Sequence, residues 1–119
     1  MKQGRKTSGG RYIKPRKKKL TGRQGQARIV KLGEVKTKLL KIRGGSKKLV
    51  SLTNDTVNLI SKGMGKRVKI KNILETPSNA FLARQNILLK DAIIETELGK
   101  ARVTNRPSQE GNVQAVLID

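Results

Sequence analysis

Apolar and polar residues alternate along several short stretches of the 119-residue chain. The stretches KKLVSLTN, TVNLIS and RVKIKNILE each place apolar side chains two positions apart, with polar residues between them. That period is typical of β-strands with one buried face, because successive side chains point to opposite sides of a strand. The pattern predicts strands at these places and a core that contains Val50, Leu52, Val57, Leu59, Val68, Ile70, Ile93, Val103 and Val116.

Glycine, proline and asparagine separate the alternating stretches. In EVKTKLLKIRGGSKKLV the residues Arg43-Gly44-Gly45-Ser46 join two strands, the first with a change of phase at its two leucines, and predict a hairpin with glycines at positive φ. KGMGKR at residues 62–67 predicts a second tight turn. We expect AFLAR to be extended, and within residues 34–119 QNILLKDAI is the only stretch where a turn or two of helix is expected.

Strands that recur about every 8–12 residues between such turns predict an all-β fold. We expect a single small barrel-like or sandwich body of short antiparallel strands at residues 34–119, preceded by a basic, extended N-terminal arm at residues 1–33 (the arm). Residues 1–24 hold ten lysines and arginines and no acid, with too few apolar residues to offset the entropy of ordering. The arm should therefore be disordered when free. The one exception that we expect is a helical turn at Gln26–Lys31.

Charge is divided unevenly along the chain, whose net charge is +20 and pI about 11.2. Residues 1–48 hold 18 basic residues and one acid, a charge of +17, whereas residues 49–119 hold 10 basic and 7 acidic residues, a charge of +3. A strongly basic end indicates a polyanion as partner, because cations that neutralise phosphates release condensed counterions. No membrane partner is expected, since the arm lacks an apolar stripe and a signal-peptide centre.

The residue types needed for common catalytic and metal sites are missing from the sequence. There is no cysteine and no histidine, which excludes disulfides, thiolate metal sites and the commonest general base. GMGKR lacks the first glycine and the hydroxyl residue of a phosphate-binding loop. Asp91, Glu95 and Glu97 leave a metal-dependent nuclease as a remote alternative, but we expect no enzyme, no metal and no cofactor.

The aromatic content distinguishes between modes of nucleic-acid binding. Tyr12 and Phe81 are the only aromatic residues, too few for a surface that stacks unpaired bases. Folded RNA, recognised through phosphates, 2′-hydroxyls and groove shape, suits a basic, glycine-rich arm better. A free-standing architectural protein that binds duplex DNA or RNA remains an alternative, and it predicts a preference for duplex DNA over folded RNA.

Three segments, GRKTSGGRYIKPRKKK at residues 4–19, KIRGGSKK at residues 41–48 and TPSNAFLARQNILLKDAIIE at residues 76–95, have a familiar order and spacing. The chain resembles the family of small-subunit ribosomal protein number eight of the archaeal and eukaryotic kind, in its short archaeal form. The resemblance implies a β-barrel-like body on small-subunit ribosomal RNA, an arm threaded among RNA helices, neighbouring small-subunit ribosomal proteins as partners, and a cytoplasmic location in the ribosome. We expect the free chain to be monomeric.

The resemblance and the charge pattern together identify the expected RNA-binding residues. In the arm these are Arg5, Lys6, Ser8, Gly9, Gly10, Arg11, Lys14, Arg16, Lys17, Lys18, Lys19 and Arg23. In the body they are Lys41, Arg43, Gly44, Gly45, Lys47, Lys48 and Arg84. Glycines are included because a backbone without side chains can approach a phosphate closely and donate N–H groups to it.

Overall fold

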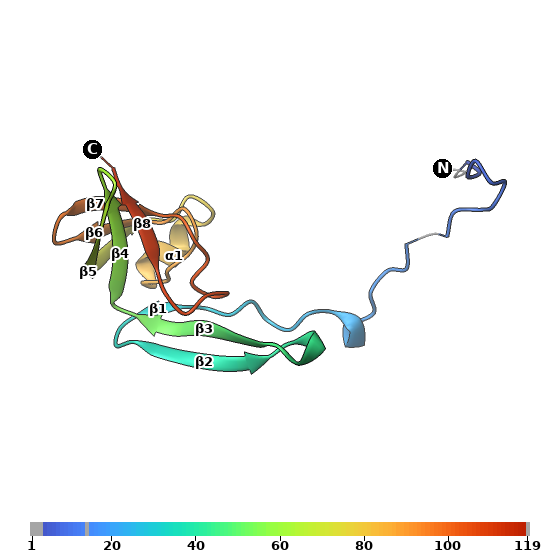
Figure 1. Cartoon of the computed structure of the whole chain (residues 1–119), viewed down its shortest axis with the longest axis horizontal. Helices are drawn as coiled ribbons and strands as arrows, with labels where there is room; N and C mark the ends of the chain where they lie inside the picture. The colour runs from blue at the N-terminus through green and yellow to red at the C-terminus, as the bar shows by residue number, and fades with distance from the viewer. Residues whose placement is uncertain (1–3, 14, 119) are drawn as a thin grey trace.

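The computed structural model describes residues 4–13 and 15–118. Figure 1 shows three parts: an extended N-terminal segment, a long hairpin and a small barrel. The extended segment gives the molecule a longest dimension of 62 Å, against 32 and 31 Å in the other directions. Among the described residues of this segment, the one helix is the short 3-10 helix η1 (Leu20–Gly22).

The barrel is built from β4 (Thr56–Ser61), β5 (Met64–Glu75), β6 (Ile93–Thr96), β7 (Gly99–Val103) and β8 (Gln114–Leu117), and it is closed. Neighbouring strands are antiparallel except β4 and β8, which are parallel. The barrel-like body is thus confirmed, but the expectation of only antiparallel strands was wrong. Five strands of alternating direction leave the first and last running the same way, so the pair that closes the barrel must be parallel.

The hairpin (residues 36–54) belongs to a separate three-stranded sheet of order β1-β3-β2. Its strands β2 (Lys36–Lys41) and β3 (Lys47–Asn54) are antiparallel, and β1 (Lys31–Leu32) pairs with β3 in parallel. The predicted hairpin is confirmed: the turn η2 (Arg43–Gly45) has φ values of 82° at Gly44 and 78° at Gly45. The register of β2 shifts near its start rather than at its two leucines.

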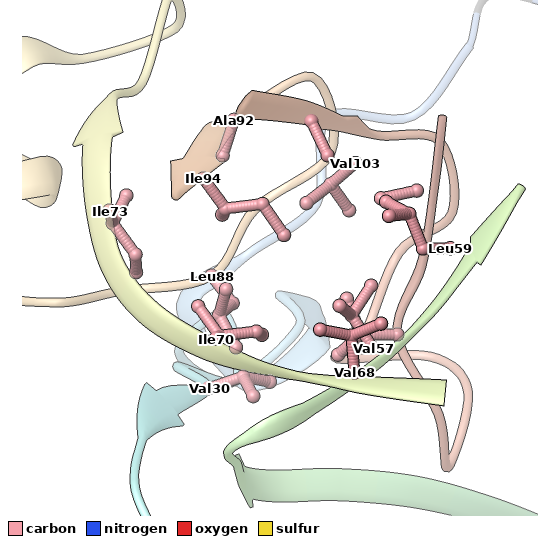
Figure 2. Packing of buried hydrophobic residues seen from close by; sticks show 13 residues of the cluster. Val30, Val57, Leu59, Val68, Ile70, Ile73, Leu88, Ala92, Ile94 and Val103 are labelled. Atoms are coloured by element: carbon pink, nitrogen blue, oxygen red, sulfur yellow. The ribbon is translucent and has the colours of Figure 1, made fainter. Parts of the chain in front are cut away.

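The core of the barrel is a cluster of 13 residues, ten of them labelled in Figure 2. Alternation identified Val57, Leu59, Val68, Ile70 and Val103 correctly. Val50 is buried outside this cluster, and Leu52 and Ile93 are only partly buried.

Val116 was assigned to the core wrongly. Its side chain is 43% exposed, because Val113 and Ala115 are the residues of this segment that face inward.

Two local predictions near the barrel were wrong. AFLAR forms the helix α1 (Ala80–Arg84) instead of an extended segment, because Asn79 caps it by accepting a hydrogen bond from the Phe81 N–H (3.1 Å). QNILLKDAI, where helix was expected, holds turns, an isolated bridge and the first residue of β6.

The helical turn expected at Gln26–Lys31 is also absent. Here the backbone is extended, because Val30 O accepts from Leu88 N (2.8 Å) and Leu32 N donates to Asn86 O (2.9 Å). Val30 is consequently 1% exposed and belongs to the barrel core.

Candidate nucleic-acid interface

The basic segment near the N-terminus folds back on itself in a tight turn. Lys6 N donates to Gly10 O and Gly9 N donates to Lys6 O, both at 2.9 Å, and Gly9 has a φ of 79°. The turn brings Arg5 and Arg11 directly opposite each other in an antiparallel bridge. Two guanidinium-bearing side chains therefore leave the backbone at one place, on one side of a glycine turn.

The hairpin tip repeats this arrangement in the body. Lys41 and Lys47 are directly opposite each other at the end of the ladder, and Ile42 N donates to Ser46 O (2.9 Å) to close the turn. Gly44 and Gly45 supply the left-handed conformations that the turn requires. Arg43 lies in the turn itself, so three exposed cations gather at the tip.

Like charges that face each other across two strands destabilise the pair. Within residues 4–13 and 15–118 the single ion pair is Arg102 with Asp91, on the barrel (2.8 Å). Neither turn therefore has a carboxylate partner among the described residues. A polyanion placed against either turn would relieve the repulsion, which makes both turns suited to phosphate.

Between the two turns the arm carries further cations on extended backbone. Arg16, Lys17, Lys18, Lys19 and Arg23 are all exposed, on either side of η1. Figure 1 shows this segment pointing away from the barrel, with η1 near the hairpin tip and the residues before it running beyond that tip. Lys14, also expected to bind RNA, lies outside the described residues. The arm thus presents cations along a line rather than as a patch.

Two expected residues lie apart from these groups. Lys48 faces the opposite side of the hairpin from Lys41 and Lys47, and its Nζ donates to Gln109 Oε1 (2.5 Å). Arg84 is exposed at the end of α1, on the barrel. The sequence reasoning passed over Lys36 and Lys38, which are exposed on β2 of the same hairpin. The alternation K-T-K in this strand was the signal that could have identified them.

The hairpin is fixed to the barrel by the loop at residues 104–113. Ser51 N donates to Pro107 O (3.2 Å) and to Glu110 O (3.0 Å), and Arg28 Nη1 donates to Ser108 O (2.9 Å). A Cβ on Gly111 would overlap the side chain of Leu49, so a larger residue there would require this half-exposed side chain to move. The hairpin tip is therefore held in one direction relative to the barrel.

The acidic residues considered for nuclease chemistry do not form a site. Asp91 accepts from Arg102 Nε (3.1 Å) and Nη2 (2.8 Å), and Glu95 lies opposite Lys100 on the outside of the barrel. In the described part of the chain, no three acidic residues are close enough together to hold a metal ion. No helix there is long and apolar enough to cross a membrane.

Comparison with known proteins adds a family to this geometry. The family described as "Ribosomal protein S8e" matches residues 1–118. A protein of Methanococcus aeolicus named small ribosomal subunit protein eS8 is 37% identical over 97% of this chain and 92% of its own length. The protein of the same name in Methanocorpusculum labreanum is 39% identical over 99% of this chain and 96% of its own length. The one in Halorubrum lacusprofundi is 38% identical over 97% of this chain and 94% of its own length.

Proposed function

The chain belongs to the ribosomal protein S8e family, and from this premise we propose that it binds and organises folded rRNA by phosphate neutralisation and shape recognition. Membership makes it a structural, non-enzymatic constituent of the small subunit of the cytoplasmic ribosome, with rRNA and ribosomal proteins as partners. The family inferred from the sequence is thereby confirmed, together with the expectation that the chain is not an enzyme. The residues that contact rRNA remain predictions.

The observation that carries this proposal is the repeated pairing of cations at glycine turns. Arg5 with Arg11, and Lys41 with Lys47, are each held face to face by backbone hydrogen bonds. In the free protein such a pair costs a few tenths of a kcal/mol or more. In the presence of RNA, each pair offers two cations at a fixed spacing to one or two phosphates. The arrangement is destabilising unless a polyanion is bound.

The small number of aromatic residues supports recognition of RNA by its shape. Of the two aromatic residues, Phe81 lies on α1 and Tyr12 has Lys6 Nζ 5.8 Å from its ring centroid. Neither is part of a stacking surface for successive unpaired bases. The arm and the hairpin tip instead place cations on two projecting elements, which suits grooves and junctions of folded RNA.

A competition between nucleic acids tests this function. We expect the full chain to bind a small-subunit rRNA fragment about tenfold or more tightly than duplex DNA of equal length at one stated salt concentration, because only the RNA offers junctions and 2′-hydroxyls. Filter binding or fluorescence anisotropy would measure both affinities. Equal affinities, or a preference for DNA, would favour a free-standing architectural protein and overturn shape recognition of rRNA.

A further inference from the structure

Among the described residues, buried apolar side chains fill one end of the barrel more completely than the other. At the end beside α1, Val30, Leu88 and Ala92 are no more than 1% exposed and occupy the interior. Figure 2 shows Val30 and Leu88 beside Ile70 on one side of the cluster, with Leu59 on the far side. Leu59 lies toward the opposite end, where the turns β4–β5 and β6–β7 lie, and buried Thr96 stands directly before the second of these turns.

At that opposite end the interior opens to solvent in a hollow of about 230 Å³ (the barrel mouth). Leu59 lies among its lining residues. The others that are apolar are Met64 at the start of β5, Leu98 in the β6–β7 turn and Leu117 at the end of β8. Met64 is 66% exposed and Leu98 49% exposed. An apolar hollow with two exposed apolar side chains is unexpected on a chain of net charge +20.

The charged residues nearest the barrel mouth are mostly lysines, although Glu97 is exposed in the β6–β7 turn beside Leu98 and is not part of the lining among the described residues. Lys62 and Lys66 are the charged residues of its lining, and no carboxylate is among them. Figure 1 places this end, which includes the β4–β5 turn and the end of β8, on the opposite side of the barrel from the hairpin. The mouth is therefore separate from the elements that carry the proposed RNA contacts.

We propose that the barrel mouth binds an apolar side chain presented by an acidic segment of another protein. RNA has no aliphatic group of that size to fill the hollow, and the mouth has no aromatic residue on which a base could stack. The two lysines favour a partner segment with Asp or Glu beside the apolar anchor. A second copy of this chain is disfavoured, because two molecules of charge +20 repel each other.

The missing cysteines make a direct test possible. In Leu98→Cys the introduced thiol is the only one in the chain, so a benzophenone maleimide can be attached at the mouth alone when the purified protein is labelled before assembly. Small subunits reconstituted with the labelled variant are isolated and photolysed, and the cross-linked peptide is identified by mass spectrometry. We expect a cross-link to a ribosomal protein at a segment that contains an apolar residue flanked by Asp or Glu. Met64→Cys provides the same readout if Leu98→Cys fails to enter subunits.

Two controls make the result specific. Ile60→Cys is a matched variant, since Ile60 is 48% exposed but lies on the outer wall of β4 and should give about tenfold less of that cross-link. Lys62→Gln with Lys66→Gln should lower the yield about tenfold by removing both charges, while the two Lys→Arg changes should preserve it. A cross-link only to rRNA or to a second copy, no cross-link, or a yield unaffected by the Gln changes would overturn the proposal.

Discussion

The hairpin and the barrel are both built from β-strands, but different interactions stabilise them. None of the six residues of β2 is buried, whereas every strand of the barrel contributes at least one residue to the buried cluster. The hairpin tip holds Lys41, Arg43 and Lys47 without a carboxylate nearby, while the barrel pairs Arg102 with Asp91 and places Glu95 opposite Lys100. The barrel is stabilised by its own burial, whereas the hairpin tip presents cations that we propose contact a polyanion.

The largest expected effect separates the two regions by burial. Ile70→Asp should unfold the barrel, because Ile70 is 6% exposed and an unpaired buried carboxylate costs several kcal/mol of the roughly 5–15 available to a small domain. Leu39→Asp is the matched change in the hairpin, where Leu39 is 57% exposed, and should leave the melting temperature nearly unchanged. Thermal melts followed by circular dichroism give both values. If Ile70→Asp melted cooperatively at the melting temperature of the parent protein, burial would not distinguish the barrel from the hairpin.

The next prediction concerns the arm. Deletion of residues 1–23 removes ten of the 28 basic residues and no acid, and should leave the barrel folded. Each phosphate contact contributes about 0.7–0.9 to the slope of log affinity against log salt, so contacts by half of these cations predict a slope flatter by about 4.

Salt titrations of full-length and truncated chains with one rRNA fragment measure both slopes, and circular dichroism checks the fold. Parallel slopes would mean that the charges of the arm stay solvated and that cations of the body, such as Arg43 and Lys47, carry the binding.

The third prediction is local to the hairpin tip. Gly44→Val with Gly45→Val should destabilise the turn by about 1–2 kcal/mol for each residue, because both glycines have φ near +80° and valine strongly disfavours that region. Gly65→Val is the control, since its backbone lies outside the left-handed region and a Cβ there meets no atom within 4 Å. Hydrogen exchange should show faster opening of β2 and β3 and an unchanged barrel. Unchanged protection of the hairpin with reduced RNA affinity would indicate that the glycines serve RNA contact alone.

The smallest expected effect tests the like-charge pair itself. Lys47→Glu places opposite charges across the ladder from Lys41 and should stabilise the free hairpin by about 0.2–1 kcal/mol while weakening rRNA binding. Lys100→Glu is the mirror change in the barrel, where it creates a like-charge pair with Glu95 and should destabilise by a similar amount. Denaturant melts and RNA affinities are compared for both. A Lys47→Glu variant that lost stability would show that the lysines do not repel each other.

The sequence predicted the features that depend on local chemistry. Gly44 and Gly45 between two alternating stretches were sufficient to identify the hairpin, and alternation placed Val57, Leu59, Val68 and Ile70 in the core. Asparagine favours the N-cap of helices, so Asn79 is a local signal for α1 that the prediction of an extended AFLAR did not use. These signals act within a few residues of each other, which is why they can be read without the fold.

Features decided by distant residues could not be predicted from the sequence. Ile93 and Ile94 are adjacent and equally apolar, and only the pairing of β6 with its neighbours turns Ile94 inward. Residues near Val30 suggested a helical turn, but backbone bonds to residues 86–88 hold them extended. For the interface, the positions of Arg5, Arg11, Lys41 and Lys47 in the sequence were known, yet their face-to-face pairing depends on turn geometry.

The parallel pairing of β4 with β8 has a consequence for the order of folding. It joins Asn58 to Gln114, so the barrel cannot close until residues 114–117 have been synthesised. The loop that holds Ser51, through Pro107 and Glu110, also comes late in the chain. A nascent chain thus exposes its basic arm and hairpin before it can complete a core, and contacts of long sequence separation form slowly. During synthesis the cationic elements are available to polyanions while the barrel is still an open sheet with unpaired edges.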